Sequence, residues 1–209
     1  MPFFNKITFK YLWRNKMKIV SITGSPRKKG NSATLVNEII SIAEDANGVV
    51  QSYHLNQLTY KGCQACMTCK EKSDTCTIKD DLTEVLSAIQ ACDLLIMASP
   101  VYFGDISAQM KGLIDRMYSF LKPNFKQQDP PGRLESGKTL IFILTQGQPD
   151  EKVFADIYPK YEMFLKFMGF TDVHLIRACG VMESGAVKQR EDILERARSV
   201  AKKVILVAS

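Results

Sequence analysis

Long apolar runs are missing from this sequence, and so is a strong excess of one charge. No window approaches the roughly 18 apolar residues of a membrane-spanning helix. Residues 1–16 also lack the apolar stretch of roughly 7 to 15 residues that a signal peptide requires. We therefore expect no membrane span, and the cytoplasm is the simplest compartment.

Charge is balanced over most of the chain. The 209 residues carry 28 Lys and Arg against 22 Asp and Glu, but four of the basic residues and none of the acidic ones lie in residues 1–16. The remaining 24 basic residues form no cluster beyond Arg27-Lys28-Lys29, so we expect no nucleic-acid partner. We interpret residues 1–16 as an N-terminal extension and residues 17–209 as one domain.

Short apolar runs alternate with amphipathic segments from Met17 onward. Near-continuous apolar strands with amphipathic helices between them indicate a parallel sheet covered on both faces, which is a doubly wound α/β fold. Ligands of such folds bind beyond the carboxyl ends of the strands. The predicted strands are residues 17–23, 49–55, 93–99 (ended by Pro100), 138–145 and about 173–178, and the predicted helices contain residues 32–46, 82–89, 107–121, 151–168 and 188–207.

The loop after the first predicted strand, GSPRKKGNS at residues 24–32, lacks both common nucleotide-binding patterns. It is not GxxxxGK[ST], which argues against a nucleoside triphosphatase. It is also not GxGxxG followed by an acidic residue about twenty positions later, which argues against a dinucleotide fold. Small residues, hydroxyls, Arg27 and Asn31 before a helix suit a single terminal phosphate. An ordinary polar turn remains the alternative.

The loop after the third predicted strand, SPVYFGD at residues 99–105, combines stiffness with aromatic surface. Pro100 restricts the backbone, Tyr102 and Phe103 supply aromatic rings, and Gly104 permits close approach of the backbone to a ligand. This composition suits a flat, partly apolar ring. The alternative is a turn whose aromatic residues pack on the core.

These two loops carry a resemblance to a known family. The stretch ITGSPRKKGNS followed by SPVYFGDISAQMKGLIDR resembles the flavodoxin-like NAD(P)H-dependent FMN reductases, and CQACMTC with TCTIKDD resembles the iron–sulfur flavoproteins within that group. The resemblance implies a five-stranded parallel sheet of order 2-1-3-4-5 with helices on both faces, an FMN cofactor, and a homodimer or homotetramer. The residues that it implies for FMN are Ser25, Arg27, Asn31, Ser32 and Ala33 at the phosphate, Pro100, Val101, Tyr102, Phe103 and Gly104 at the isoalloxazine, and Gln146 and Gly147 in a third loop.

Cysteine is scarce outside one insertion at residues 61–81. This insertion holds four of the six cysteines with the spacing C-x2-C-x2-C-x6-C. Structural zinc usually uses two separated C-x2-C pairs, whereas a compact run of three thiolates is typical of iron–sulfur sites. We therefore predict one [4Fe–4S] cluster, with a loop of reduced thiols, a zinc site and a disulfide as alternatives. The predicted ligands are Cys63, Cys66, Cys69 and Cys76, while Cys92 and Cys179 are predicted to be small buried residues.

Together these features predict an FMN-dependent oxidoreductase that passes electrons between NAD(P)H or a redox carrier protein and a small-molecule or protein acceptor. Lys61, Lys70 and Lys72 would raise the potential of a nearby cluster or receive an acidic carrier. No side chain is expected to act as a general acid or base. The alternative function is a cluster-free NAD(P)H-dependent FMN or quinone reductase. A pure electron carrier is disfavoured because small flavodoxins are usually strongly acidic, and this chain is not.

Overall fold

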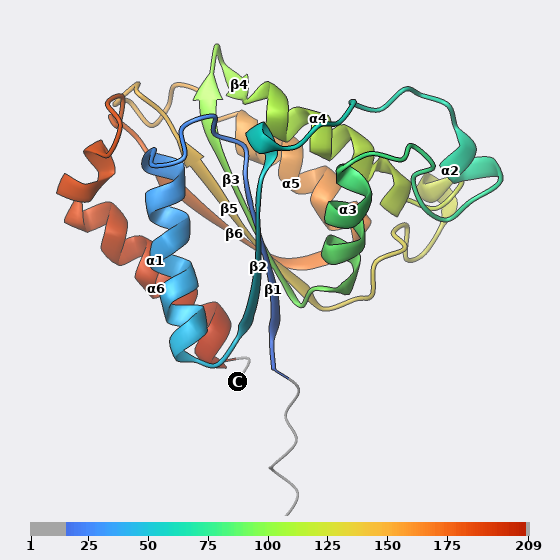
Figure 1. Cartoon of the computed structure of the whole chain (residues 1–209), viewed down its shortest axis with the longest axis horizontal. Helices are drawn as coiled ribbons and strands as arrows, with labels where there is room; N and C mark the ends of the chain where they lie inside the picture. Colours follow the sequence, from blue (N-terminus) through green and yellow to red (C-terminus); the bar gives the residue numbers. More distant parts are fainter. Residues whose placement is uncertain (1–15, 208–209) are drawn as a thin grey trace, which may run out of the picture.

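A parallel sheet with helices on both faces forms the centre of the computed structural model, which describes residues 16–207 (Figure 1). None of the helices within that range is both long and apolar enough to cross a lipid bilayer. The expected N-terminal extension, residues 1–16, lies outside the described residues except for Lys16. The strands are β1 (Lys18–Thr23), β2 (Val49–His54), β3 (Leu94–Tyr102), β4 (Asp105–Ile106), β5 (Lys138–Thr145) and β6 (Phe170–Ala178). The α-helices are α1 (Asn31–Asp45), α2 (Thr68–Glu71), α3 (Leu82–Ala91), α4 (Ala108–Arg116), α5 (Ile157–Met168) and α6 (Glu191–Val207), and the 3-10 helices are η1 (Leu55–Gln57), η2 (Met117–Phe120), η3 (Phe125–Gln127) and η4 (Ala186–Gln189).

The strand order is β2-β1-β3-β5-β6, and β4 pairs with β3 away from this path. All pairings along the path are parallel, whereas β4 runs antiparallel to β3. The predicted doubly wound fold and its order 2-1-3-4-5 are therefore confirmed, because β5 and β6 are the fourth and fifth parallel strands. The register places Thr23 beside Ala98, Pro100 beside Thr145, and Thr145 beside Ala178. The carboxyl ends of these strands consequently meet at one edge of the sheet.

Two apolar layers cover the two faces of the sheet. Helices α1 and α6 lie against one face, and α3, α4 and α5 lie against the other (Figure 1). Successive residues of β3 alternate between the layers: Leu94 and Ile96 pack toward α1 and α6, whereas Leu95 and Met97 pack toward the opposite helices. Burial on both faces explains why this strand is an almost continuous apolar run.

Strand β3 extends to Tyr102, so the expectation that Pro100 ends it is wrong. The Gly24 amide donates to the Ala98 carbonyl oxygen at 2.8 Å, which shows that the backbone polar groups of Ala98 point toward β1. The backbone groups of Pro100, two residues further along the strand, point to the same side. At that level β1 has already ended, at Thr23, so it offers no partner. The missing N–H of Pro100 therefore removes no hydrogen bond of the sheet.

Helix α5 begins at Ile157 and not near the predicted residue 151. Phe154 has a φ of 65°, which a right-handed helix does not accommodate. Arg177 also donates from Nη1 to the Glu151 carbonyl oxygen and from Nη2 to the Val153 carbonyl oxygen, each at 2.6 Å. These contacts occupy carbonyl groups that an earlier helical turn would have used. The predicted helix 107–121 is likewise shorter, since α4 ends at Arg116 and η2 follows.

Candidate functional site

The loop between β1 and α1 presents a helix N-terminus without a capping side chain. Gly30 is the N-cap of α1, no side chain bonds to the cap, and the first turn holds no acidic residue. The loop is folded back on itself, because the Arg27 amide donates to Ser25 Oγ and the Gly30 amide donates to the Arg27 carbonyl oxygen, both at 3.1 Å. An uncapped helix N-terminus with free backbone donors suits an anion, so the observed loop fits the phosphate of FMN.

Two residues expected at that phosphate also hold neighbouring loops together. Asn31 Nδ2 donates to the carbonyl oxygens of Val181 and Glu183 at 2.9 Å each, and Asn31 Oδ1 accepts from the Val187 amide at 3.1 Å. Ser32 Oγ shares a hydrogen bond of 2.9 Å with Thr145 Oγ1 in a buried position. These side-chain contacts lie within the protein, so the FMN roles of Asn31 and Ser32, like that of Ala33, stay predictions.

Arg27 is one of three exposed cations of this loop, together with Lys28 and Lys29. Its Nη1 donates to the Met182 carbonyl oxygen at 3.3 Å, so the β6–η4 segment, residues 179–185, borders the site. Met182 itself is 69% exposed. Sequence reasoning missed this segment, because neither its spacing nor its composition indicated that it would reach the β1–α1 loop.

The second loop is a tight hairpin between β3 and β4 that exposes two aromatic rings. Phe103 and Gly104 have φ values of 49° and 87°, and Tyr102 pairs with Asp105 across the turn. A bulky residue rarely adopts a positive φ, and such strain is common where a ligand binds. Phe103 is fully exposed and Tyr102 is 43% exposed, so the alternative in which both aromatic residues pack on the core is wrong.

The third loop, after β5, is held from within the protein. Gln146 is buried, its Oε1 accepts from Arg177 Nη2 at 2.7 Å, and its Nε2 donates to the Gln148 carbonyl oxygen at 2.9 Å. Its side chain therefore fixes the loop. Gly147 lies close to Met182, since a Cβ at this glycine would come within 2.9 Å of Met182 Cε. The FMN contacts implied for Gln146 and Gly147 stay predictions.

All four clustered cysteines line one cavity of about 220 Å³ between the cysteine segment and α4–η2. Ala65 and Met67, on either side of Cys66, have φ values of 51° and 57°. These left-handed residues reverse the backbone between successive cysteines and let their side chains reach one cavity. The cavity also contains donors to sulfur: the Ala65 amide lies 3.4 Å from Cys63 Sγ.

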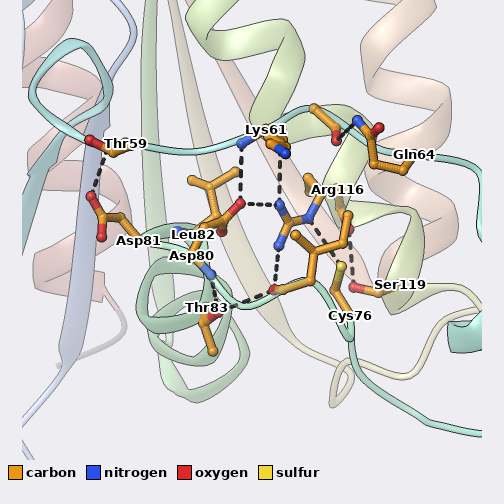
Figure 2. Close-up of polar contacts among 12 residues, drawn as sticks. Thr59, Lys61, Gln64, Cys76, Asp80, Asp81, Leu82, Thr83, Arg116 and Ser119 are labelled. Atoms are coloured by element: carbon orange, nitrogen blue, oxygen red, sulfur yellow. Dashed lines mark hydrogen bonds and ion pairs between the residues drawn. The ribbon is translucent and has the colours of Figure 1, made fainter.

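Three cations fasten this segment to the rest of the protein. Lys70 Nζ donates to the carbonyl oxygens of Tyr118 and Leu121 at 2.6 Å each. Arg133 Nη1 donates to the carbonyl oxygens of Cys69 at 3.0 Å and Leu121 at 2.8 Å. Arg116 reaches in from α4 and bonds Cys76 directly (Figure 2). Positive charges around clustered thiols suit an anionic group bound through thiolates.

The thiols differ in their local environment. A hydrogen bond from Thr68 lowers the pKa of the Cys66 thiol. Burial raises the pKa of the Cys69 thiol, and the nearby Cys76 and Cys66 add to this rise, although Lys70 and Arg133 oppose it. Cys66, Cys69 and Cys76 all line the same cavity, which places these thiols near one another.

The four thiols nevertheless do not form a closed metal site. Within residues 16–207, no three His, Cys, Asp or Glu side chains come close enough together to hold a metal ion. The donor set and its surrounding cations fit an iron–sulfur cluster, but the ligand assignment stays a prediction. The other two cysteines, Cys92 and Cys179, are buried as predicted, and burial raises the pKa of Cys92 to about 11.

Comparison with known proteins identifies the family. The sequence model described as NADPH-dependent FMN reductase matches residues 17–153. An iron-sulfur flavoprotein of Archaeoglobus fulgidus is 32% identical over 136 residues, which are 65% of this chain and 58% of that protein. An iron-sulfur flavoprotein of Methanocaldococcus jannaschii is 39% identical over 100 residues, which are 48% of this chain and 51% of that protein. The chain thus spans little more than half the length of these curated relatives.

A solved structure confirms the fold. The protein described as NAD(P)H:quinone oxidoreductase from Methanothermobacter marburgensis aligns with a TM-score of 0.70 at 17% identity, over 90% of this chain and 96% of that one. At this identity the likeness concerns the fold alone. The family model, however, covers well over half of the 209 residues, so the chain belongs to the NADPH-dependent FMN reductase family.

Proposed function

We propose that this chain is an FMN-dependent oxidoreductase that carries one [4Fe–4S] cluster and passes electrons between NAD(P)H or a redox carrier protein and an acceptor. Residues 17–209 form the FMN-binding domain, and residues 61–81 form its cysteine-rich insertion. The observation that carries the proposal is the placement of an uncapped helix N-terminus and an exposed aromatic hairpin at the same edge of the sheet. One suits a phosphate and the other a flat ring, as FMN requires.

The protein residues bind and orient the cofactor. Backbone amides at the start of α1, together with Ser25 and Arg27, would hold the phosphate, while residues 100–104 would line the isoalloxazine. When bound, FMN supplies hydride and single-electron transfer, which protein side chains alone do not perform. The observed contacts of Gln146 would keep the third loop in place beside the ring.

The cavity lined by Cys63, Cys66, Cys69 and Cys76 supports the cluster. The four thiols form a donor set of the kind that iron–sulfur clusters use. Left-handed residues between them turn the backbone, and three cations lie nearby. The curated relatives named iron-sulfur flavoproteins agree with this assignment. Such thiols must stay reduced, so we place the protein in the cytoplasm. A homodimer or homotetramer remains part of the proposal, by family resemblance.

A cluster-free NAD(P)H-dependent FMN or quinone reductase is the second candidate. One observation favours it: among residues 16–207 no three potential ligands converge closely enough to hold a metal ion. In this case the four cysteines form a loop of free thiols, and the FMN site acts alone on NAD(P)H and a small acceptor.

Anaerobic purification with assays of FMN, iron and acid-labile sulfide distinguishes the two candidates. We expect bound FMN together with about four iron and four sulfide per chain. Cys69→Ala should keep FMN and lose iron, whereas the matched control Cys92→Ala should keep both, because Cys92 lies outside the cysteine cavity. FMN without iron would establish the cluster-free reductase, and a chain that binds no FMN would refute both candidates.

A further inference from the structure

Arg116 is a buried cation placed against the cysteine segment. Its side chain has no exposed surface, and it is the largest fully buried side chain among the described residues. A guanidinium remains charged under all ordinary conditions and carries five N–H donors, so its burial demands matching acceptors. Figure 2 shows the side chain from α4 surrounded by groups of the cysteine segment.

The acceptors of Arg116 are of two kinds. Nη1 donates to Asp80 Oδ2 at 2.8 Å and to the Lys61 carbonyl oxygen at 2.9 Å, and Nη2 donates to the Ile78 carbonyl oxygen at 3.0 Å. These oxygen contacts fasten both ends of the insertion to α4. Nε donates to Cys76 Sγ at 3.0 Å, and this contact is made to one of the four thiols that line the cavity.

The other two cations of the segment do not make such a contact. Within residues 16–207, Lys70 and Arg133 donate their side-chain hydrogen bonds to backbone carbonyl oxygens, and Arg133 forms its ion pair with Asp74. Anchoring the segment thus needs only oxygen acceptors. The contact of Arg116 with sulfur therefore calls for a separate explanation.

A hydrogen bond to a ligand sulfur changes the electronic properties of the group that the sulfur binds. Reduction by one electron adds one negative charge to an iron–sulfur cluster, and hydrogen bonds to its sulfur ligands favour the reduced state. A buried charge is poorly screened by salt or water, so its effect on the potential persists in solution. We propose that Arg116 raises the reduction potential of the group held by the cysteines, by donating its Nε–H to Cys76.

This inference rests on the proposed cluster, and it also gives Arg116 a role that the sequence assigned to lysines. Lys61, Lys70 and Lys72 are nearer to the cysteines in sequence, but the guanidinium that bonds sulfur comes from 40 residues beyond Cys76. Within residues 16–207 it is the only cationic side chain that donates a hydrogen bond to a cysteine sulfur.

The test compares two variants that both lack the carboxylate partner. Asp80→Asn alone keeps the Arg116 contact with Cys76, whereas Asp80→Asn with Arg116→Met removes it without leaving a buried carboxylate unpaired. We expect equal iron and sulfide in both, but a more negative midpoint potential in the double variant, measured by an anaerobic dithionite titration followed by electron paramagnetic resonance. A tenfold change in the one-electron equilibrium corresponds to about 59 mV.

Equal midpoint potentials in the two variants would overturn the inference while leaving the proposed function intact. If the double variant does not fold, Arg116→Lys replaces it, since lysine keeps the charge but lacks the Nε donor. A smaller shift to more negative potential is then expected, and an unchanged potential would overturn the inference. A wild-type chain without iron and sulfide would overturn both the inference and the cluster-containing function.

Discussion

Ser107 Oγ donates a hydrogen bond of 2.8 Å to the carbonyl oxygen of Gly24. Ser107 is also the N-cap of α4, where its Oγ accepts from the Met110 amide at 3.3 Å, and its own amide donates to Ser99 Oγ at 2.9 Å. One buried hydroxyl thus joins the loop after β1 to the hairpin after β3. A Cβ at Gly24 would lie 2.8 Å from both Ser107 Oγ and Met110 Cβ, so this close contact needs glycine.

Removal of that hydroxyl should weaken both the fold and the cofactor site. Ser107→Ala is expected to lower the free energy of unfolding by about 2 kcal/mol, because a helix cap is lost and the Gly24 carbonyl oxygen loses its donor. FMN affinity should fall as well. Urea denaturation and FMN titration measure the two effects, and Ser87→Ala, an exposed serine of α3, is the matched control. Unchanged stability would show that the two loops are held together by other contacts.

Arg27→Ala should weaken FMN by about 1 to 3 kcal/mol, the scale of a lost charge-assisted hydrogen bond. Riboflavin lacks the phosphate, so its weaker binding should not change in this variant. Titration by flavin fluorescence measures both ligands. Lys28→Ala, an exposed cation of the same loop, is the control and should leave both affinities unchanged. Equal FMN affinity in Arg27→Ala and wild type would place the phosphate elsewhere.

Phe103→Asn should change stability and FMN affinity in opposite directions. Asn tolerates the positive φ of this position, so the variant should gain about 1 kcal/mol in free energy of unfolding. It should lose FMN affinity by about 1 kcal/mol, the scale of an aromatic contact. Phe167→Asn on α5 provides an exposed aromatic control for FMN affinity. A gain in stability without loss of FMN would show that the hairpin is strained but does not touch the ring.

The sequence predicted what depends on local pattern. The five parallel strands, the two loops at their carboxyl ends and the burial of Cys92 and Cys179 all follow from apolar runs and nearby turn residues. Prediction from the sequence failed where contacts between residues far apart in the chain determine the local structure. Pro100 remains inside β3 because β1 has already ended beside it, and no local signal contains that fact.

The same distinction applies to the candidate site. Asn31 is predicted to contact the phosphate because it begins a helix after a polar loop, and this role stays a prediction. The sequence did not indicate that its side chain also bonds backbone groups of residues 181–187. No sequence pattern indicated a role for Arg116, which lies buried against Cys76. Both contacts join segments far apart in the chain, which composition and periodicity do not reveal.

Arg133→Met should loosen the cysteine segment without unfolding the sheet. The guanidinium Nη1 donates to three carbonyl oxygens. In the variant those of Cys69 and Ser119 lose this donor, whereas that of Leu121 keeps Lys70 Nζ. We expect a loss of about 2 kcal/mol and faster amide hydrogen exchange in residues 66–73 than in β3. Lys126→Met, an exposed cation of η3, should change neither quantity. Uniformly faster exchange across the sheet would contradict a local role for Arg133.

Asp105→Asn should reveal a pH-dependent contribution to stability. The Asp105 carboxylate accepts from Lys160 Nζ at 2.8 Å and from the Tyr161 hydroxyl at 2.9 Å. Burial favours the neutral acid, but these hydrogen bonds more than offset that effect and hold the pKa of Asp105 below its ordinary value. Because the folded pKa lies below the unfolded value of about 3.9, the contribution is complete above about pH 4 and is lost as the pH falls through the lowered folded value.

The variant should therefore be less stable than wild type by about 1 kcal/mol at pH 7, a modest figure because the carboxylate is partly exposed to solvent. The difference should begin to shrink near pH 4, where the unfolded chain takes up a proton at this carboxylate, and should disappear once the pH falls below the lowered folded pKa. Urea denaturation between pH 3 and pH 8 measures this dependence. Asp115→Asn removes an exposed ion pair on α4 and should show a smaller difference throughout. A difference between Asp105→Asn and wild type that stays constant with pH would mean that the Asp105 carboxylate stabilises the hairpin by packing, and that its charge contributes nothing.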